Sequence, residues 1–264
     1  MSKQDRLNQI LQLVVERGSV EVEEAAQILK VSPATIRRDF DALSERQLLN
    51  RTHGGASATG GSFNNLPLRY KVAKDDEIKK RIAAVAAGMV KRHQVVGING
   101  GTTATEVARA LAASPEFAPG EDSELPPLTV VTNALNIATE LTVRHQIRIV
   151  VTGGVARAQS YELTGPFAES VLEEVIIDIA FIGVEGLHPD TGAAAIYEDE
   201  ARVNQMIAAR ANKVVVVADS SKFHKRSFAA IAPFSSINVI ITDVGIDPSV
   251  KKLLEGKGVE IVIA

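Results

Sequence analysis

Apolar residues in the first 29 positions recur at intervals of three and four, which predicts two short amphipathic helices. The apolar positions of the first helix are Leu7, Ile10, Leu11 and Val14. Gly18 is expected to end this helix, and a second is expected over residues 23–29. The positions available for packing on the second helix are Ala25, Ala26, Ile28 and Leu29. Two helices packed through these positions would start a small helical domain.

A third helix is predicted to begin at Pro33. Ser32 is a suitable N-cap, and proline is favourable at the first helical position because its missing N–H has no partner there anyway. One apolar stripe is formed by Ile36, Phe40 and Leu43. The residues that point away from this stripe are Thr35, Arg37, Arg38 and Asp41. A short helix with an apolar back and an arginine-bearing front is typical of a DNA recognition helix.

Residues 48–56 predict a small β-hairpin after this helix. Glycines at its end allow the backbone to turn or to approach a phosphate closely. Two helices, a short turn, a third helix and a hairpin predict a winged helix-turn-helix domain over residues 1–57. The candidate DNA-binding residues are Ser32, Thr35, Arg37, Arg38, Arg51, His53, Gly54 and Gly55. The alternative is an ordinary three-helix bundle with a charged, solvated face.

Charge alone does not predict nucleic-acid binding. The first 56 residues hold eight basic and eight acidic side chains, and the whole chain has a net charge of -3. Four arginines gather on the third helix and the hairpin: Arg37, Arg38, Arg46 and Arg51. We therefore expect local, oriented contact with double-stranded DNA and a modest non-specific component.

Strands and helices alternate after a small-residue linker expected at residues 58–75. The predicted strands are 95–99, 128–132, 147–152, 177–183, 214–219, 239–242 and 259–263. The predicted helices are 76–92, 103–113, 134–145, 167–174, 198–211 and 248–255. Several strands are nearly continuous runs of Val and Ile, as in strands buried on both faces, so an α/β domain with a mostly parallel sheet is expected over residues 76–264. Residues 114–127 are rich in Pro, Glu and Asp and predict an irregular, poorly ordered loop.

Polar and glycine-rich turns follow four of these strands. Ligands of parallel sheets bind where the strands end, and free helix amides next to glycines favour an anion. The candidate effector-binding residues at these turns are Asn99, Gly100, Gly101, Thr102, Thr103, Thr132, Asn133, Gly153, Gly154, Asp219 and Lys222. The glycine–threonine loop would hold a phosphate, Lys222 would supply a positive charge, and Asp219 would accept from hydroxyl groups. We expect a small phosphorylated polyol.

Composition narrows the classes of protein. The 264 residues are 45% hydrophobic and 4% aromatic, enough for a sizeable aliphatic core, and no cysteine is present for disulfides or thiolate metal sites. The five histidines have no metal-ligand spacing, so neither a metal nor a cofactor is expected. The polar start resembles no signal peptide, and no apolar run approaches the length of a membrane span. A cytoplasmic location with no membrane partner is expected.

Both halves resemble the DeoR family of bacterial sugar-metabolism regulators. In the first half the matching residues are Arg6, Ile10, Val14, Ser32, residues 35–40 and the hairpin residues 51–56. In the second half they are residues 101–103, Thr132, Asn133, Gly153, Gly154, Asp178, residues 180–183, Glu200 and residues 218–222.

The resemblance implies a winged helix-turn-helix followed by a sugar-phosphate sensor, with Glu200 added to the effector site. The implied sensor fold is similar to ribose-5-phosphate isomerase and glucosamine-6-phosphate deaminase. The implied function is an oligomeric repressor of carbohydrate catabolism that a phosphorylated sugar modulates. One departure is Asn99, because the family usually has Asp just before the glycine–threonine loop.

Two other classes of protein stay open. An isomerase would need a carboxylate poised after the strand at residues 177–183, where Glu185 stands without an acidic neighbour. A second domain that only assembles subunits would have no need to combine Lys222 with the glycine–threonine loop. A regulator that binds its ligand without turnover is the interpretation that the residues favour.

Overall fold

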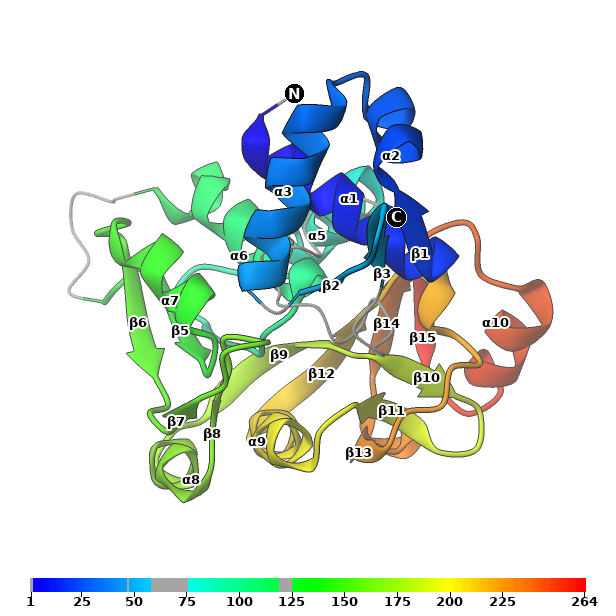
Figure 1. Ribbon diagram of the computed structural model, residues 1–264. Helices are drawn as coiled ribbons and strands as arrows, with labels where there is room; N and C mark the ends of the chain where they lie inside the picture. Colours follow the sequence, from blue (N-terminus) through cyan, green and yellow to red (C-terminus); the bar gives the residue numbers. More distant parts are fainter. Residues whose placement is uncertain (1, 47, 58–75, 119–124) are drawn as a thin grey trace. The chain divides into compact units, whose positions relative to one another are not determined.

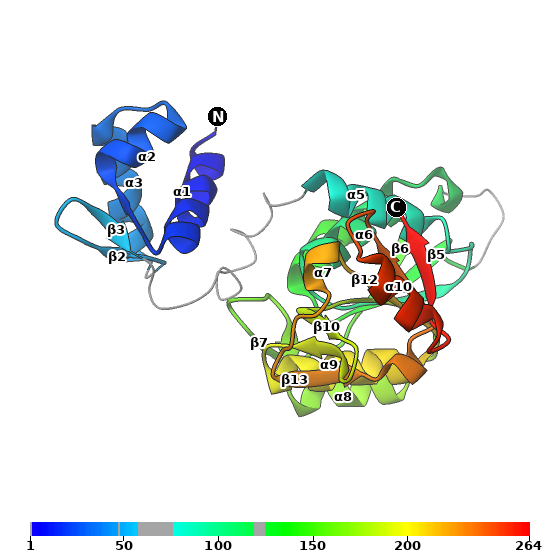
Figure 2. The same cartoon turned by 90° about the vertical axis from the view of Figure 1, so that its right-hand side faces the viewer.

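The computed structural model describes residues 2–46, 48–57, 76–118 and 125–264. The chain divides into two compact units, Met1–Lys74 and Asp75–Ala264. The linker expected at residues 58–75 lies outside the described residues. Figures 1 and 2 show the helices and strands of both units.

In its described residues, the N-terminal unit has three helices and a small antiparallel sheet (Figure 2). Its elements are α1 (Lys3–Arg17), β1 (Ser19–Glu21), α2 (Val22–Leu29), α3 (Pro33–Glu45), β2 (Asn50–Arg51) and β3 (Gly55–Ser57). The three predicted helices and the hairpin are confirmed. The sheet order is β1-β3-β2, with Val20 opposite Ala56. Strand β1 was not predicted, because three residues with a single apolar position are too short for a periodic signal.

Capping residues define the ends of α1, and α2 buries one face. Ser2 and Asp5 form a reciprocal capping box at the start of α1, and Gly18 ends the helix at φ 77°. On α2 the buried residues are Val22, Ala25, Ala26 and Leu29. The prediction that Ile28 packs inward is wrong, because 42% of this side chain is exposed. Ile28 falls outside the stripe that repeats every three to four residues from Val22.

The C-terminal unit is built on a seven-stranded parallel sheet, and all seven predicted strands are present. The strands are β4 (Val95–Ile98), β5 (Leu128–Thr132), β6 (Ile147–Val151), β9 (Ile177–Gly183), β12 (Ala211–Val217), β14 (Val239–Thr242) and β15 (Glu260–Ile263). Their order is β15-β14-β12-β9-β4-β5-β6. The predicted α/β class with a mostly parallel sheet is confirmed.

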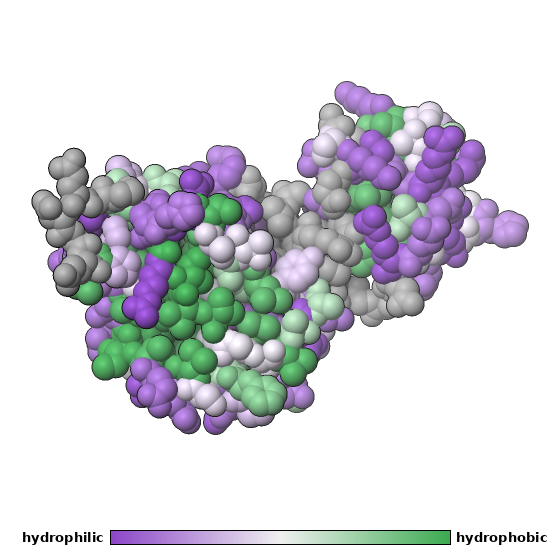
Figure 3. All heavy atoms as spheres, turned by 90° about the vertical axis from the view of Figure 1, so that its left-hand side faces the viewer, coloured by the Kyte–Doolittle hydropathy of each residue, from purple (hydrophilic) through white to green (hydrophobic). Residues whose placement is uncertain are grey.

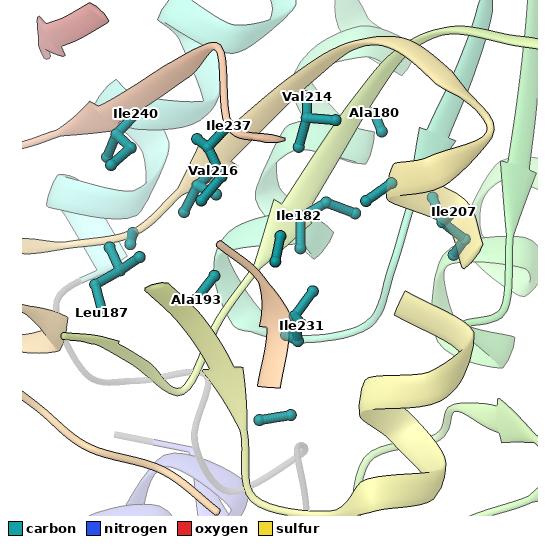
Figure 4. Close-up of a cluster of buried hydrophobic side chains, with 14 of the residues drawn as sticks. Ala180, Ile182, Leu187, Ala193, Ile207, Val214, Val216, Ile231, Ile237 and Ile240 are labelled. Carbon is teal, nitrogen blue, oxygen red and sulfur yellow. The ribbon is translucent and has the colours of Figure 1, made fainter. Parts of the chain in front are cut away.

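Helices cover both faces of this sheet (Figure 1). The helices are α5 (Asp76–Ala87), α6 (Thr102–Ala113), α7 (Leu135–Thr142), α8 (Pro166–Glu173), α9 (Glu198–Ala209) and α10 (Pro248–Glu255). The first three share one apolar cluster, and the last three share the other. Along β9, Ile179 and Phe181 belong to the first cluster, whereas Ala180 and Ile182 belong to the second (Figure 4). This alternation explains why the strands are apolar at nearly every position.

Several short elements of the C-terminal unit had no signal in the sequence. They are the hairpin β7 (Val155–Ala156) and β8 (Leu163–Thr164), the antiparallel sheet β10 (Gly186–His188), β11 (Gly192–Ala195) and β13 (Ala229–Ala232), and the 3-10 turns η2 (Pro115–Phe117), η3 (Ser220–Lys222) and η4 (Phe234–Ser236). The loop prediction for residues 114–127 is wrong at its start, because Phe117 is buried in the core. Residues 119–124 lie outside the described residues.

The direction of the chain across the sheet reverses between β4 and β9. From β4 the chain proceeds through β5 to β6 at one edge, and from β9 it proceeds to β15 at the other. The connections that leave the carboxyl ends of β4 and β9 therefore run in opposite directions across the sheet. In open parallel sheets, this divergence is the place where ligands bind.

Candidate DNA interface and ligand site

Helix α3 presents a polar face opposite its buried stripe. Ser32 caps the helix by accepting from the amide of Thr35 at 3.2 Å, and both arginines that follow are exposed. Arg38 lies nearly opposite the buried stripe, at the centre of the exposed face, because successive residues are rotated by about 100°. Arg37 lies to one side and pairs with Glu23 of α2 at 3.2 Å. The face that the sequence predicted for DNA is therefore open at Arg38 and partly paired at Arg37.

A buried ion pair fixes α3 to α1. Asp39 has an exposed side-chain fraction of 3%, and its carboxylate accepts from Arg6 at 2.5 and 3.3 Å. Hydrogen bonding to Asp39 raises the pKa of Arg6 above its ordinary value. In the sequence, only the family resemblance connects these two residues. The signal for the pair was the position of Asp39 on the apolar side of the helix, three residues after Ile36.

The hairpin residues serve mainly to hold the wing in place. Arg51 pairs with Asp41 at 3.0 Å, donates to the carbonyl of Gly55 at 2.8 Å, and lies 5.5 Å from the centre of the Phe40 ring. A Cβ at Gly55 would lie 2.2 Å from the carbonyl oxygen of Val20, so the pairing of β1 with β3 requires glycine. The predicted phosphate-contacting residues His53 and Gly54 are exposed on the same hairpin.

The side chain of Asn99 joins the end of β4 to the end of β9 by two hydrogen bonds. Its buried side chain donates to the carbonyl of Gly183 at 2.9 Å and accepts from the amide of Gly183 at 2.7 Å. A carboxylate could accept from the amide but would repel the carbonyl. The amide of Asn99 is therefore matched to the backbone of Gly183, at the point where the chain reverses direction.

The loop after β4 leads into the N-terminus of α6. Gly101 is the N-cap residue, has φ 116°, and gives the helix no side-chain cap. A Cβ at this position would meet no atom within 4 Å, so the space beside the first amides is open. Thr102 and Thr103 form the first turn, with Thr103 buried. Uncapped amides and the helix dipole together favour an anion here.

Local contacts within the protein hold the turns after β5 and β6. Thr132 accepts from the amide of Ala134 at 3.0 Å. Gly153 and Gly154 have φ of 75° and 124°, and a Cβ at Gly154 would lie 2.6 Å from the carbonyl oxygen of Thr164. Gly154 therefore allows the β7–β8 hairpin to pack closely, and its position is explained without a ligand.

The turn after β12 forms a second polar group. Asp219 accepts from the amide of Ser221 at 3.1 Å and so caps η3. Lys222 lies with its ammonium 3.4 Å from Glu185, which also pairs with Lys225. β9 separates this turn from β4, so the two groups of predicted residues are about 10 Å apart, given strand spacings of about 4.8 Å.

A buried acid that the sequence analysis missed lies beside the loop after β4. Asn133 donates to Glu162 at 3.0 Å, and a Cβ at Gly100 would collide with the Glu162 side chain. Burial and the nearby charge of Glu200 raise the pKa of Glu162 to about 8. The predicted residue Glu200 reaches this region from α9. Nothing in the local sequence around Glu162 signals this position, because only the fold of the β7–β8 hairpin brings it inward.

Arg157 neutralises the acidic start of α9. Its guanidinium lies 3.3 Å from Asp199, 3.1 Å from Glu200, and 3.5 Å from the centre of the Tyr197 ring. Within the described ranges, no group of three His, Asp or Glu residues is placed to hold a metal ion. None of the described helices is both long enough and apolar enough to cross a membrane.

Comparisons with known proteins cover both units. The model of the DeoR-like helix-turn-helix domain matches residues 6–60, and that of the DeoR C terminal sensor domain matches residues 74–244. The chain is 34% identical over 258 residues to the HTH-type transcriptional regulator GlpR of Haloferax volcanii, covering 98% of this chain and 96% of that protein. It is 30% identical over 261 residues to the glycerol-3-phosphate regulon repressor of Escherichia coli, covering 99% of each.

Among solved structures, ribose 5-phosphate isomerase A of Methanocaldococcus jannaschii is similar at 21% identity and a TM-score of 0.41, over 57% of this chain and 55% of that one. Both family matches are to domains of transcriptional regulators, and the relatives are regulators over their full length. The predicted role as a DNA-binding regulator is therefore confirmed, and the isomerase alternative is rejected. The chain belongs to the DeoR family of transcriptional regulators.

Proposed function

We propose that this regulator represses a carbohydrate-catabolism operon and that a small phosphorylated polyol, bound in the C-terminal unit, modulates repression. The observation that carries the effector proposal is the uncapped N-terminus of α6, which lies where the chain reverses direction between β4 and β9. Backbone amides at Gly101, Thr102 and Thr103 would hold the phosphate. Lys222 and Lys225 share one carboxylate, Glu185, and the remaining positive charge would attract an anion to this edge of the sheet.

The name of one relative supports a short polyol. One is a glycerol-3-phosphate regulon repressor, and it matches this chain over nearly its full length. Binding would change DNA affinity only if the effector prefers one of the two states, with a coupling of typically 1–3 kcal/mol.

The phosphate site is tested by replacing Gly101 with alanine. Wild-type protein should unfold at a higher temperature with glycerol 3-phosphate and show no shift with glycerol. When the ligand concentration is a hundred times the dissociation constant, the free energy of unfolding increases by about 2.7 kcal/mol. Gly101→Ala should lose most of this shift, because a side chain would alter the positive φ and stand beside the amides.

Gly258→Ala is the matched control for Gly101→Ala. Gly258 also has positive φ, at 86°, and a Cβ there would meet no atom within 4 Å. Both variants therefore introduce backbone strain, but only one changes the start of α6. If glycerol 3-phosphate raised the unfolding temperature equally in the two variants, the phosphate would not bind at the N-terminus of α6.

We also propose that the protein is a homo-oligomer and that the edge of the sheet at β6 joins two copies. Figure 3 shows apolar side chains gathered on the face that bears α7, β6, β7 and α8. Its exposed apolar residues are Leu135, Val143, Val151, Val155 and Phe167. An edge strand presents unpaired backbone groups, and a second copy of the same strand can pair with them antiparallel. A single winged helix has few DNA contacts, so two joined copies would read paired half-sites.

Val151→Lys tests this interface. A lysine on β6 would place a charge within the apolar face, so the mass in solution, measured by light scattering during size-exclusion chromatography, should fall to a smaller species. Val244→Lys is the control, because Val244 is 77% exposed and lies outside this face. A monomeric wild-type protein, or an unchanged mass in Val151→Lys, would refute the interface.

A further inference from the structure

The β7–β8 hairpin folds over the end of β5 and places Glu162 inside the protein. Residue 162 forms an antiparallel bridge with Ala134, and the amide of Leu163 donates to the carbonyl of Asn133 at 2.7 Å. Tyr161, just before it, has a positive φ of 61°, which is uncommon for a bulky residue. Backbone strain of this kind persists only where the surrounding structure enforces it. Residue 162 is therefore held at a fixed place beside the loop after β4.

The carboxyl group of Glu162 lies beside Gly100, which directly precedes the proposed phosphate site. An ideal Cβ on Gly100 would lie 2.4 Å from both Cγ and Oε1 of Glu162, so the acid fills the space next to this glycine. Gly100 is two residues from Thr102, a backbone distance of at most about 7 Å. A molecule that contacts both Glu162 and the amides of α6 would thus be short, on the scale of a three- or four-carbon polyol phosphate.

Two buried amide oxygens near Glu162 need hydrogen-bond donors. Asn133 and Asn204 both contact Glu162, and both are almost completely buried. The Oδ1 atom of each finds no hydrogen-bond partner in the part of the chain that the structure describes. Buried polar atoms without partners are costly, and hydroxyl groups are suitable donors for them.

The charges around Glu162 exclude a phosphate from this end of the site. Glu200 and Asp199 face Glu162 from α9, and the adjacent cation, Arg157, is paired with both of them. The loops after β4 and β5 have no ionisable residue from Asn99 to Thr105 or from Thr132 to Thr139. After β9, Glu185 is paired with two lysines. An uncharged, hydroxyl-bearing group is the ligand that this environment suits.

We propose that Glu162 selects the effector: as a neutral carboxylic acid it binds, together with Asn133 and Asn204, the hydroxyl groups of a short polyol phosphate. The phosphate of this ligand lies at the N-terminus of α6, so the inference rests on the proposed function. Glu162 thereby supplies an acidic group to the site, where the family usually has Asp and this chain has the uncharged Asn99. A neutral acid both donates and accepts, whereas a carboxylate only accepts and would repel the acceptor oxygens around it.

Selection by Glu162 should therefore weaken as pH rises. Burial raises the pKa of Glu162 to about 8, so the acid is mostly neutral at pH 7 and mostly ionised at pH 9. The probes are glycerol 3-phosphate and propyl phosphate, which lacks both hydroxyl groups but has the same phosphate. Titration calorimetry at pH 7 and pH 9 gives the ratio of their affinities, in which the ionisation of the phosphate cancels.

In wild-type protein the ratio should be at least 10 in favour of glycerol 3-phosphate at pH 7 and fall at least fivefold by pH 9. Glu162→Gln keeps a donor and an acceptor, so its ratio should not change with pH. Glu162→Ala should bring the ratio close to 1 while leaving propyl phosphate binding unchanged. A wild-type ratio that does not change with pH, or a ratio preserved in Glu162→Ala, would refute the role of Glu162. The proposed phosphate site would not be affected by either result. Failure of both phosphates to bind overturns the proposed function, and this inference with it.

Discussion

Arg38→Ala is expected to lower the affinity for the specific operator by about 5- to 150-fold, because a good contact to a base edge contributes about 1–3 kcal/mol. Arg38 lies at the centre of the exposed face of α3, opposite the stripe that includes Ile36 and Phe40. Its guanidinium can donate in two parallel directions, as recognition of guanine requires. Arg37 lies to one side of this face and pairs with Glu23 of α2. We expect the smaller loss there.

The measurement uses an operator selected from a random DNA library with the wild-type protein. Fluorescence anisotropy then gives affinities for this operator and for an unrelated duplex, at two salt concentrations. Arg38→Ala should lose more affinity for the operator than for the unrelated duplex. Arg17→Ala is the control, because it also removes one positive charge from an exposed arginine of the same unit, paired there with Glu24 of α2. Equal losses on both duplexes would assign Arg38 to a phosphate contact and refute its role in recognition.

The main sheet could be predicted because its signal is local. Several of its strands are nearly continuous runs of Val and Ile bounded by turns. Ile179, Ala180, Phe181 and Ile182 are all apolar because each face of β9 packs against helices. The helix-turn-helix was predictable for the same reason, with Ser32 and Pro33 marking the start of α3. In contrast, β11 is a short run of small residues that acquires its structure only by pairing with β10 and β13.

The candidate ligand site was predictable only in part. Glycines and threonines at strand ends identify the loop after β4, because this chemistry is encoded within five residues. The bond from Asn99 to Gly183 joins residues 84 positions apart, and Glu162 approaches Gly100 from a hairpin 62 positions away. Such contacts depend on strand order, which the sequence pattern does not specify. The pairing of Lys222 with Glu185 could not be predicted for the same reason.

Asp39→Ala is expected to lower the free energy of unfolding of the N-terminal unit by about 3 kcal/mol or more. Removing one partner of a buried ion pair typically costs about 3–5 kcal/mol, because the remaining charge keeps its desolvation cost without compensation. Here the remaining charge is Arg6, whose side chain is 15% exposed and lies between α1 and α3. Small domains are stable by about 5–15 kcal/mol, so the variant would be partly unfolded at moderate temperature.

Asp41→Ala separates this loss from a general effect of removing an acid from α3. Asp41 is two residues further along the same helix, has a 58% exposed side chain, and pairs with Arg51 at 3.0 Å. Exposed pairs contribute about 0–1 kcal/mol, so this control should unfold nearly as the wild type does. Urea titration of the full chain, followed by hydrogen exchange at α1 and α3, measures both variants. Arg6→Ala and the double variant complete a cycle in which the two changes should be strongly non-additive. Equal stability in Asp39→Ala and Asp41→Ala would show that the pair between α1 and α3 contributes no more than a surface contact.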